Sequence, residues 1–323
     1  MVQLQRKRLT RRSAIAVGSS AWLLSSSAAL RRTQASELSE ANGCTLGFST
    51  YGMPSIKSER AIGLLNEIGF DSVEISVREG ADADSATLSS SRRREIRNRL
   101  SDSGMKLTSL MEHVGPSDNK KQQEHALQRL RQAAELAYEL SPDSPPLVQS
   151  VLGGGDFSIE REHLRDYLGR WSELSQELNI VFALKPHRGG VVSRPSEAIW
   201  LFEQLGKPER LRMVYDFSHY IFRGMTMEST IRESLPYVSH VAVKDATQTD
   251  DGVRFLLPGE GGAIDFAKLI RQLHAGGYRG DINCEVSSMV SRQENYDAIA
   301  AARTCYNNLS AAFERSGVGR PTQ

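Results

Sequence analysis

The chain has 323 residues, 39% of them hydrophobic and 24% charged, which is typical of an ordinary globular protein with one large domain or two small ones. Its formal net charge of +1 excludes the global positive field by which a protein attracts nucleic acid. The three cysteines (Cys44, Cys284 and Cys305) lack metal-binding spacing and allow at most one disulfide.

The first 35 residues differ in composition from the rest. A basic start is followed by an apolar and small-residue core at 14–29, which is too short and too serine-rich for a comfortable transmembrane span. "TRRSAI" at Thr10–Ile15 resembles the twin-arginine motif of bacterial signals, although Ala14 stands where a bulky apolar residue is usual. We therefore expect residues 1–35 to direct export to the bacterial periplasm, and a disordered basic tail is the alternative.

Downstream of Cys44, short apolar strands alternate with amphipathic helices. The first strand is "CTLGFS", and the helix after it places Ala61, Leu64, Leu65 and Ile68 on one face before it ends at Gly69. The same unit then repeats to the end of the chain. Further strands are expected at 71–77, 106–112, 147–152, 180–184, 211–215, 238–245 and 281–286. Further helices are expected at 89–103, 124–140, 159–178, 195–205, 228–234, 266–274 and 294–315.

This alternation requires a parallel sheet that is covered by helices. Eight strands and eight helices over about 270 residues predict an α/β fold, the closed (β/α)8 TIM barrel. We expect one domain at 44–315, followed by a short tail at 316–323. A doubly wound open sheet is the alternative, but no GxGxxG fingerprint follows the first strand.

In a TIM barrel the active site lies at the carboxyl ends of the strands, so polar residues that follow the apolar runs should share one mouth. These residues are Glu74, Glu112, His113, Lys185, His187, Asp216, His219, Lys244, Asp245 and Glu285. One such residue alone is more often structural, but so many charges at one rim require mutual pairing or a ligand. His125, His163 and His274 fall on predicted helices and are interpreted as surface residues.

Four segments resemble the sugar phosphate isomerase/epimerase group of xylose-isomerase-like barrels, which also includes the endonuclease IV fold. They are "VYDFSHY" (Val214–Tyr220), "HVAVKD" (His240–Asp245), "LPGEGGAIDF" (Leu257–Phe266) and "GGYRGDINCEV" (Gly276–Val286). The resemblance runs from about residue 44 to 315. It implies a divalent metal (Mn²⁺, Mg²⁺ or Zn²⁺) on a glutamate after strand five, an aspartate after strand six, a histidine of strand seven and a glutamate of strand eight. It also implies that two glutamates move a proton next to a carbonyl.

Residue by residue, the resemblance assigns Asp216 and Glu285 as metal ligands. Lys185 and Ala242 stand at the other two ligand positions, so two of the four ligands are replaced. His240 shares a strand face with Ala242 but lies roughly 6 to 7 Å farther from the mouth. We therefore interpret Lys185 as a cation between the two carboxylates, which should raise its pKa.

This interpretation gives a set of predicted site residues. The catalytic residues are Lys185, Glu285, His187 and His219, and His219 also matches a family histidine that touches substrate oxygens. The substrate-binding residues are Glu74, His113, Arg188, Lys244 and Asp245. A structural salt bridge in an inactive site is the alternative reading of Lys185.

The sequence thus predicts an isomerase or epimerase that acts next to a carbonyl of a sugar or sugar derivative through an enediol-type intermediate. A sugar lyase and a non-catalytic exported sugar-binding protein are the alternatives. An endonuclease IV-type metal hydrolase is disfavoured, because it needs more histidines than the rim offers. Arg188 and Arg254 could hold a phosphate or carboxylate, but export favours a free or oxidised sugar. We expect a small carbohydrate as the partner, with no nucleic acid and no membrane span in the mature protein, and a homo-oligomer is compatible with the sequence.

Overall fold

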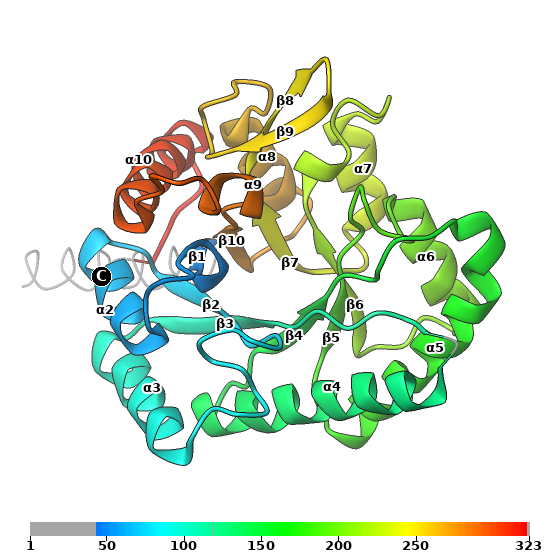
Figure 1. The fold of residues 1–323 in the computed structure, drawn as a ribbon. Coiled ribbons are helices and arrows are strands. Elements are labelled where there is room, and N and C mark those ends of the chain that lie inside the picture. The colour runs from blue at the N-terminus through cyan, green and yellow to red at the C-terminus, as the bar shows by residue number, and fades with distance from the viewer. Residues whose placement is uncertain (1–42, 118, 322–323) are drawn as a thin grey trace, which may run out of the picture.

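Eight parallel strands close into a barrel in the computed structural model, which describes residues 43–117 and 119–321 (Figure 1). Around the barrel the strands are β1 (Thr45–Ser49), β2 (Ser72–Ser76), β3 (Lys106–Met111), β4 (Leu147–Ser150), β5 (Phe182–Leu184), β6 (Leu211–Tyr215), β7 (Val238–Val243) and β10 (Asp281–Cys284). β10 pairs with β1 and closes the sheet. The predicted TIM barrel is confirmed. The predicted export signal lies outside the described residues.

In the part of the chain that the structure describes, eight helices of eight or more residues surround the barrel (Figure 1). They are α2 (Ser58–Ile68), α3 (Ser90–Ser103), α4 (Lys120–Leu140), α5 (Phe157–Glu177), α6 (Pro195–Gln204), α7 (Met227–Ser234), α8 (Phe266–Ala275) and α10 (Ala298–Ser316). Each was predicted, and the predicted ends differ from the observed ends by about one turn or less. Apolar side chains such as Leu65, Trp171 and Phe182 are fully buried in the core. Within the described part of the chain, no helix has the length and apolar character that a membrane span requires.

Several short elements after the strands were not predicted. Two 3-10 turns, η1 (Thr50–Gly52) and η2 (Phe217–His219), follow β1 and β6, and a short helix, α9 (Ser288–Ser291), follows β10. An antiparallel hairpin of β8 (Asp245–Thr249) and β9 (Gly252–Leu256) follows β7. Gly252, the first residue of β9 after the turn, has a φ of 119°, a conformation that favours glycine. All four elements belong to connections at the carboxyl end of the barrel.

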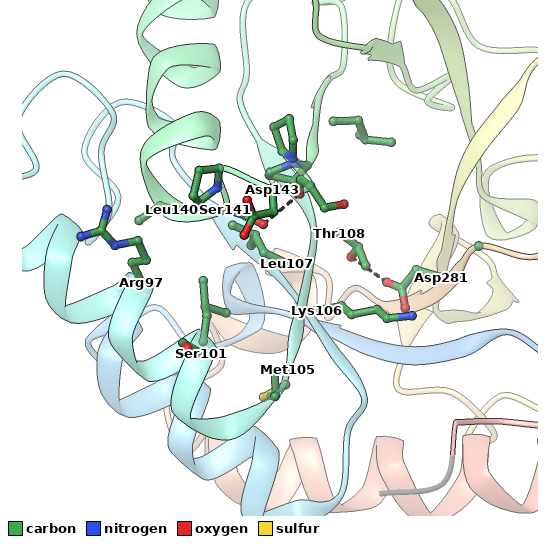
Figure 2. Close-up of a pocket in the computed structure, with 18 of the residues that line it drawn as sticks. Arg97, Ser101, Met105, Lys106, Leu107, Thr108, Leu140, Ser141, Asp143 and Asp281 are labelled. Atoms are coloured by element: carbon green, nitrogen blue, oxygen red, sulfur yellow. Dashed lines mark hydrogen bonds between the residues drawn. The ribbon is translucent and has the colours of Figure 1, made fainter. Parts of the chain in front are cut away.

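The amino-terminal end of the barrel carries a separate hollow of about 700 Å³ (Figure 2). Its lining includes the first residues of β3, β4 and β10, together with Arg97 of α3 and Asp143 of the loop before β4. On its wall Thr108 donates a hydrogen bond of 3.0 Å to Asp281. Because the strands of a TIM barrel carry their active sites at the other end, we do not assign the catalytic site here.

The segments next to this end are also fixed by side chains. Arg320, in the predicted tail, donates hydrogen bonds of 2.8 and 2.9 Å to the carboxylate of Asp71.

The cysteines Cys44, Cys284 and Cys305 are buried free thiols, so the one disulfide that the sequence allows is not formed.

A buried ionic cluster joins α4 to the ends of β2 and β3. Arg129 donates hydrogen bonds to Asp84 (2.5 Å), to Glu112 (2.6 Å) and to the carbonyl oxygen of Val77 (2.7 Å). Only 3% of Arg129 and 1% of Glu112 are exposed. Glu112, which the sequence placed in the mouth, is therefore held by this arginine, and the loop after β2 is anchored to α4.

We expect Arg129→Met to lower the free energy of unfolding by about 3–5 kcal/mol, because it leaves two buried carboxylates without their cation. Arg131→Met on the same helix is the matched control. Arg131 pairs with the exposed Glu177, so its replacement should cost about 1 kcal/mol or less. Chemical denaturation of both variants measures the difference, and equal losses would contradict the structural role of Arg129.

Candidate active site

Two lysines and two carboxylates meet at the carboxyl end of the barrel. Lys185 follows β5, Asp216 follows β6, Lys244 follows β7 and Glu285 follows β10, so neighbouring parallel strands bring the four side chains together. Lys185 Nζ lies 2.6 Å from Glu285 Oε2 and 3.0 Å from Asp216 Oδ2. Lys244 Nζ lies 2.5 Å from Asp216 Oδ2 and 3.1 Å from Glu285 Oε1. We call these four residues the charge cluster.

The charge cluster confirms that Lys185 lies between the two carboxylates and shows that Lys244 is a second cation there. Burial lowers the pKa of Lys185, but the charges of Glu285 and Asp216 outweigh burial and raise it, as the sequence predicted. Burial raises the pKa of Glu285, but Lys185 and Lys244 outweigh it and lower this pKa to about 2. The pKa of Asp216 is also well below its ordinary value, because the same lysines outweigh its burial. Glu285 is consequently a weak base.

Three histidines lie beside the charge cluster. The rings of His187 and His219 have their centroids 4.1 Å apart, and His113 follows β3. Burial lowers the pKa of His113 to about 4, assisted by the charge of Arg78. Burial also lowers the pKa of His187 to about 4, assisted by Lys244, and the pKa of His219 to well below its ordinary value. The imidazoles are therefore uncharged at neutral pH and can accept a proton. Their lowered pKa makes each a weaker base than an ordinary histidine, although His113 and His187 remain stronger bases than Glu285.

A cavity of about 80 Å³ lies over the charge cluster. Its walls include Tyr51, His113, Lys185, His187, Lys244, Phe255 and Glu285. Its volume corresponds to roughly three waters at ~30 Å³ each, far below the ~300 Å³ of the smallest sites for drug-sized ligands. The ring of Phe255, on β9, lies 5.2 Å from the Lys244 ammonium and 5.1 Å from the His219 ring. The unpredicted hairpin thus supplies one wall of the cavity.

Other predicted site residues lie away from the cavity lining. Glu74 is inside the barrel, where it accepts hydrogen bonds from Gln149 (2.6 Å) and Asn283 (3.3 Å). His240 Nε2 lies 3.4 Å from the same carboxylate, deep in the barrel as its position in β7 predicted. Glu74 therefore contributes to the polar interior beneath the mouth. Arg188 is half-buried and does not line the cavity.

Asp245 holds the loop that follows the hairpin. Its Oδ2 accepts hydrogen bonds of 3.1 Å from the backbone N–H groups of Gly259, Gly261 and Gly262. A Cβ atom at Gly261 would lie 2.8 Å from the carbonyl oxygen of Ala246, so a larger residue would clash there. The structure thus gives Asp245, predicted to bind substrate, a positioning contact with the glycine-rich segment "LPGEGG".

The histidines predicted to be on the surface lie on helices away from the mouth. His125 is exposed on α4, whereas His163 on α5 and His274 on α8 are half-buried. The cavity lining also includes Tyr51, Gln149 and Phe255, which were not predicted from the sequence. A signal existed only for Gln149, which is a polar residue within the apolar strand "LVQSVL".

The residues present do not fit the divalent metal that the resemblance implied. The ammonium groups of Lys185 and Lys244 contact the carboxylate oxygens of Asp216 and Glu285 that would bind it. A protonated lysine has no lone pair to donate, and Ala242 has no donor atom. Within residues 43–117 and 119–321, no three histidine, cysteine or acidic side chains are grouped to hold a metal ion.

Two curated proteins share part of the sequence. The chain is 30% identical over 118 residues to a Mus musculus protein provisionally named hydroxypyruvate isomerase, a match that covers 35% of this chain and 40% of that protein. It is 26% identical over 136 residues to inosose dehydratase of Geobacillus thermodenitrificans, covering 38% of this chain and 45% of that protein. The chain thus matches less than half the length of either relative.

Comparison of structures and of the whole sequence identifies the family. The crystal structure of 3-keto-D-glucoside 4-epimerase from E. coli superposes with a TM-score of 0.66 and 16% identity, over 83% of this chain and 99% of that one. This likeness shows the fold. The sequence profile described as Xylose isomerase-like TIM barrel matches residues 62–306, well over half of the chain. The chain therefore belongs to the xylose isomerase-like TIM barrel family.

Proposed function

We propose that the protein is an isomerase or epimerase that moves a proton between carbons next to the carbonyl of a small sugar derivative. One observation carries this proposal: Lys185, Lys244, His113 and His187 line the same small cavity, two as buried ammonium groups and two as histidines of lowered pKa. Removal of a proton next to a carbonyl requires a base and a positive group at the developing oxyanion. The small cavity favours a substrate of about three or four carbons.

The roles follow from the charges of the site. The ammonium groups of Lys185 and Lys244 stabilise the enediolate oxygen as negative charge develops on it. An imidazole nitrogen of His113 or His187 takes the proton from carbon. In the isomerase, the hydroxyl proton on the neighbouring carbon passes to the former carbonyl oxygen, and the imidazolium returns its proton to that neighbouring carbon. In the epimerase, the same carbon takes a proton from water on its opposite face, and the imidazolium releases its own proton to water. Glu285 keeps Lys185 charged, and its own pKa of about 2 makes Glu285 a poor base.

The names of similar proteins support this class of reaction. A hydroxypyruvate isomerase and a 3-keto-glucoside epimerase both carry names of reactions next to a carbonyl. Inosose dehydratase supports a second candidate, a lyase, because loss of hydroxide from the same enediolate gives an elimination. The two candidates share the first proton transfer and differ in the fate of the intermediate.

Exchange of carbon-bound hydrogen in D₂O tests the proton transfer. Hydroxypyruvate, glyceraldehyde and dihydroxyacetone are incubated with the protein, and NMR follows the loss of C–H signals. We expect exchange with at least one of them. His113→Gln or His187→Gln should slow it about 10²-fold or more, whichever histidine is the base. His125→Gln, on an exposed helix position, is the matched control and should exchange normally.

The products separate the candidates. A rearranged or epimerised product supports the isomerase or epimerase, and a dehydrated product replaces it with the lyase. Unchanged exchange in the His113→Gln/His187→Gln double variant would contradict the assigned bases. Tight binding of these compounds without any exchange would favour a non-catalytic sugar-binding protein.

The charge cluster makes a separate prediction for Lys185→Met. One ammonium then remains for two carboxylates, so the pKa values of Asp216 and Glu285 should rise. We expect a loss of about 3–5 kcal/mol in the free energy of unfolding at neutral pH. The loss relative to wild type should shrink as pH falls, because protonation of one carboxylate relieves the repulsion in the variant.

In the wild-type protein, by contrast, the stabilisation that Glu285 provides decreases as pH falls. The folded-state pKa of Glu285, about 2, lies below its ordinary value of 4.5, so its stabilising contribution is present above that value and is lost as pH falls toward 2. Lys268→Met is the control, since Lys268 pairs with Glu228 where both are exposed. Denaturation curves across this pH range measure the effect. A loss in Lys185→Met that does not change with pH would contradict the charge cluster as its cause.

Export is a separate part of the proposal and rests on the sequence of residues 1–35. If the twin-arginine system reads Arg11 and Arg12, changing both to lysine should leave the precursor in the cytoplasm with its leader attached. Fractionation of a bacterium that expresses the double variant checks this outcome. Normal processing of that variant would exclude the twin-arginine route.

A further inference from the structure

Among the residues that the structure describes, no acidic side chain forms an ion pair with Arg78. It follows β2 at the mouth of the barrel, and its Cζ lies 4.6 Å from the centre of the Tyr51 ring. Its Nε is buried and has no hydrogen-bond partner in the described residues. By contrast, Arg92, Arg129 and Arg320 each contact a carboxylate at 2.5 to 2.8 Å. An arginine that is held in place but unpaired is suited to bind an anion from outside the chain.

The position of Arg78 connects it to the cavity. Tyr51, on which its guanidinium packs, lines the cavity, and the Tyr51 and His113 rings have their centroids 6.2 Å apart. The backbone beside Arg78 is fixed as well, because Arg129 donates a hydrogen bond of 2.7 Å to the carbonyl oxygen of Val77. The guanidinium is therefore held next to the wall that carries His113.

The buried carboxylates near the cavity are already held by other cations, and Arg129 holds Asp84 and Glu112. Asp216 and Glu285 are already paired with Lys185 and Lys244, so this group of four is electrically neutral. A ligand with one negative charge would balance the guanidinium. A planar carboxylate matches the planar donor fork of arginine, and packing on an aromatic ring limits the freedom that the side chain loses on binding.

We propose that Arg78 binds the carboxylate of the substrate and that the substrate is a small hydroxy-keto acid. This inference rests on the proposed function, since it names the substrate class of the same site. The carboxylate contacts Arg78 beside His113, and the adjacent carbonyl oxygen faces the lysines. The cavity of about 80 Å³ agrees with such a short molecule.

Binding of glycerate and glycerol tests the proposal without turnover. Both have three carbons and lack the carbonyl group, and only glycerate has a carboxylate. Isothermal titration calorimetry measures both affinities in the wild-type protein and in Arg78→Met. We expect wild type to prefer glycerate, and Arg78→Met to bind glycerate about ten- to a hundredfold more weakly while its affinity for glycerol stays the same.

Two further variants make the result specific. Arg78→Lys keeps the positive charge but loses the planar guanidinium, so it should retain part of the preference for glycerate over glycerol. It replaces Arg78→Met as the test variant if Arg78→Met does not fold. Arg97→Met removes an arginine at the opposite end of the barrel (Figure 2) and should bind glycerate like wild type. Equal glycerate affinity in wild type and Arg78→Met, or an equal loss in Arg97→Met, would overturn the proposal.

Binding of inorganic phosphate shows whether Arg78 prefers a phosphate or a carboxylate. Tighter binding of phosphate than of glycerate, lost in Arg78→Met, would replace the carboxylate with a phosphate and overturn the assignment of a keto acid. A different result would contradict the proposed function. In that case the protein would still prefer glycerate over glycerol but would catalyse no deuterium exchange.

Discussion

Mutual neutralisation of four buried charges is the constraint on which the site depends. Each member of the charge cluster comes from a different strand of one side of the barrel, and each lysine contacts both carboxylates. Removal of any one member leaves a buried charge without a counter-charge, which is far more costly than loss of an exposed ion pair. The same pairing keeps the lysines positive and Glu285 non-basic, so structural stability and the proposed chemistry rest on the same contacts.

A second ionic cluster supports the opposite wall of the cavity. Arg129 binds Glu112, which precedes His113, and the carbonyl oxygen of Val77, which precedes Arg78. One helix side chain thus fixes the backbone beside a proposed base and a proposed anion receptor. Beneath both clusters, Glu74 accepts hydrogen bonds from Gln149 and Asn283 in the polar interior of the barrel. The mouth therefore rests on a rigid polar floor.

Sequence patterns predicted the barrel because the periods of strands and helices differ, and they predicted Lys185 between Asp216 and Glu285 because strand ends converge in this fold. They assigned Lys244 to substrate binding and did not predict its contacts with both carboxylates. They missed the hairpin of β8 and β9, whose strands have five residues each and of which β8 is largely polar. The sequence patterns also could not show which groups the predicted site residues would contact. Glu112 was expected in the mouth, but its cation lies on the following helix, and Asp245 binds glycines that are 14 to 17 residues away. Such pairings depend on three-dimensional proximity, which periodicity does not report.

The hairpin has a consequence for how this scaffold can diversify. It reaches the cavity through Phe255, while the charges that the proposed chemistry needs come from the ends of the barrel strands. Asp245 anchors the return loop through backbone N–H groups, and these three contacts do not involve the side chain at position 255. Evolution or protein engineering can therefore reshape the volume offered to a substrate by altering one modular insertion, and leave the electrostatic machinery intact.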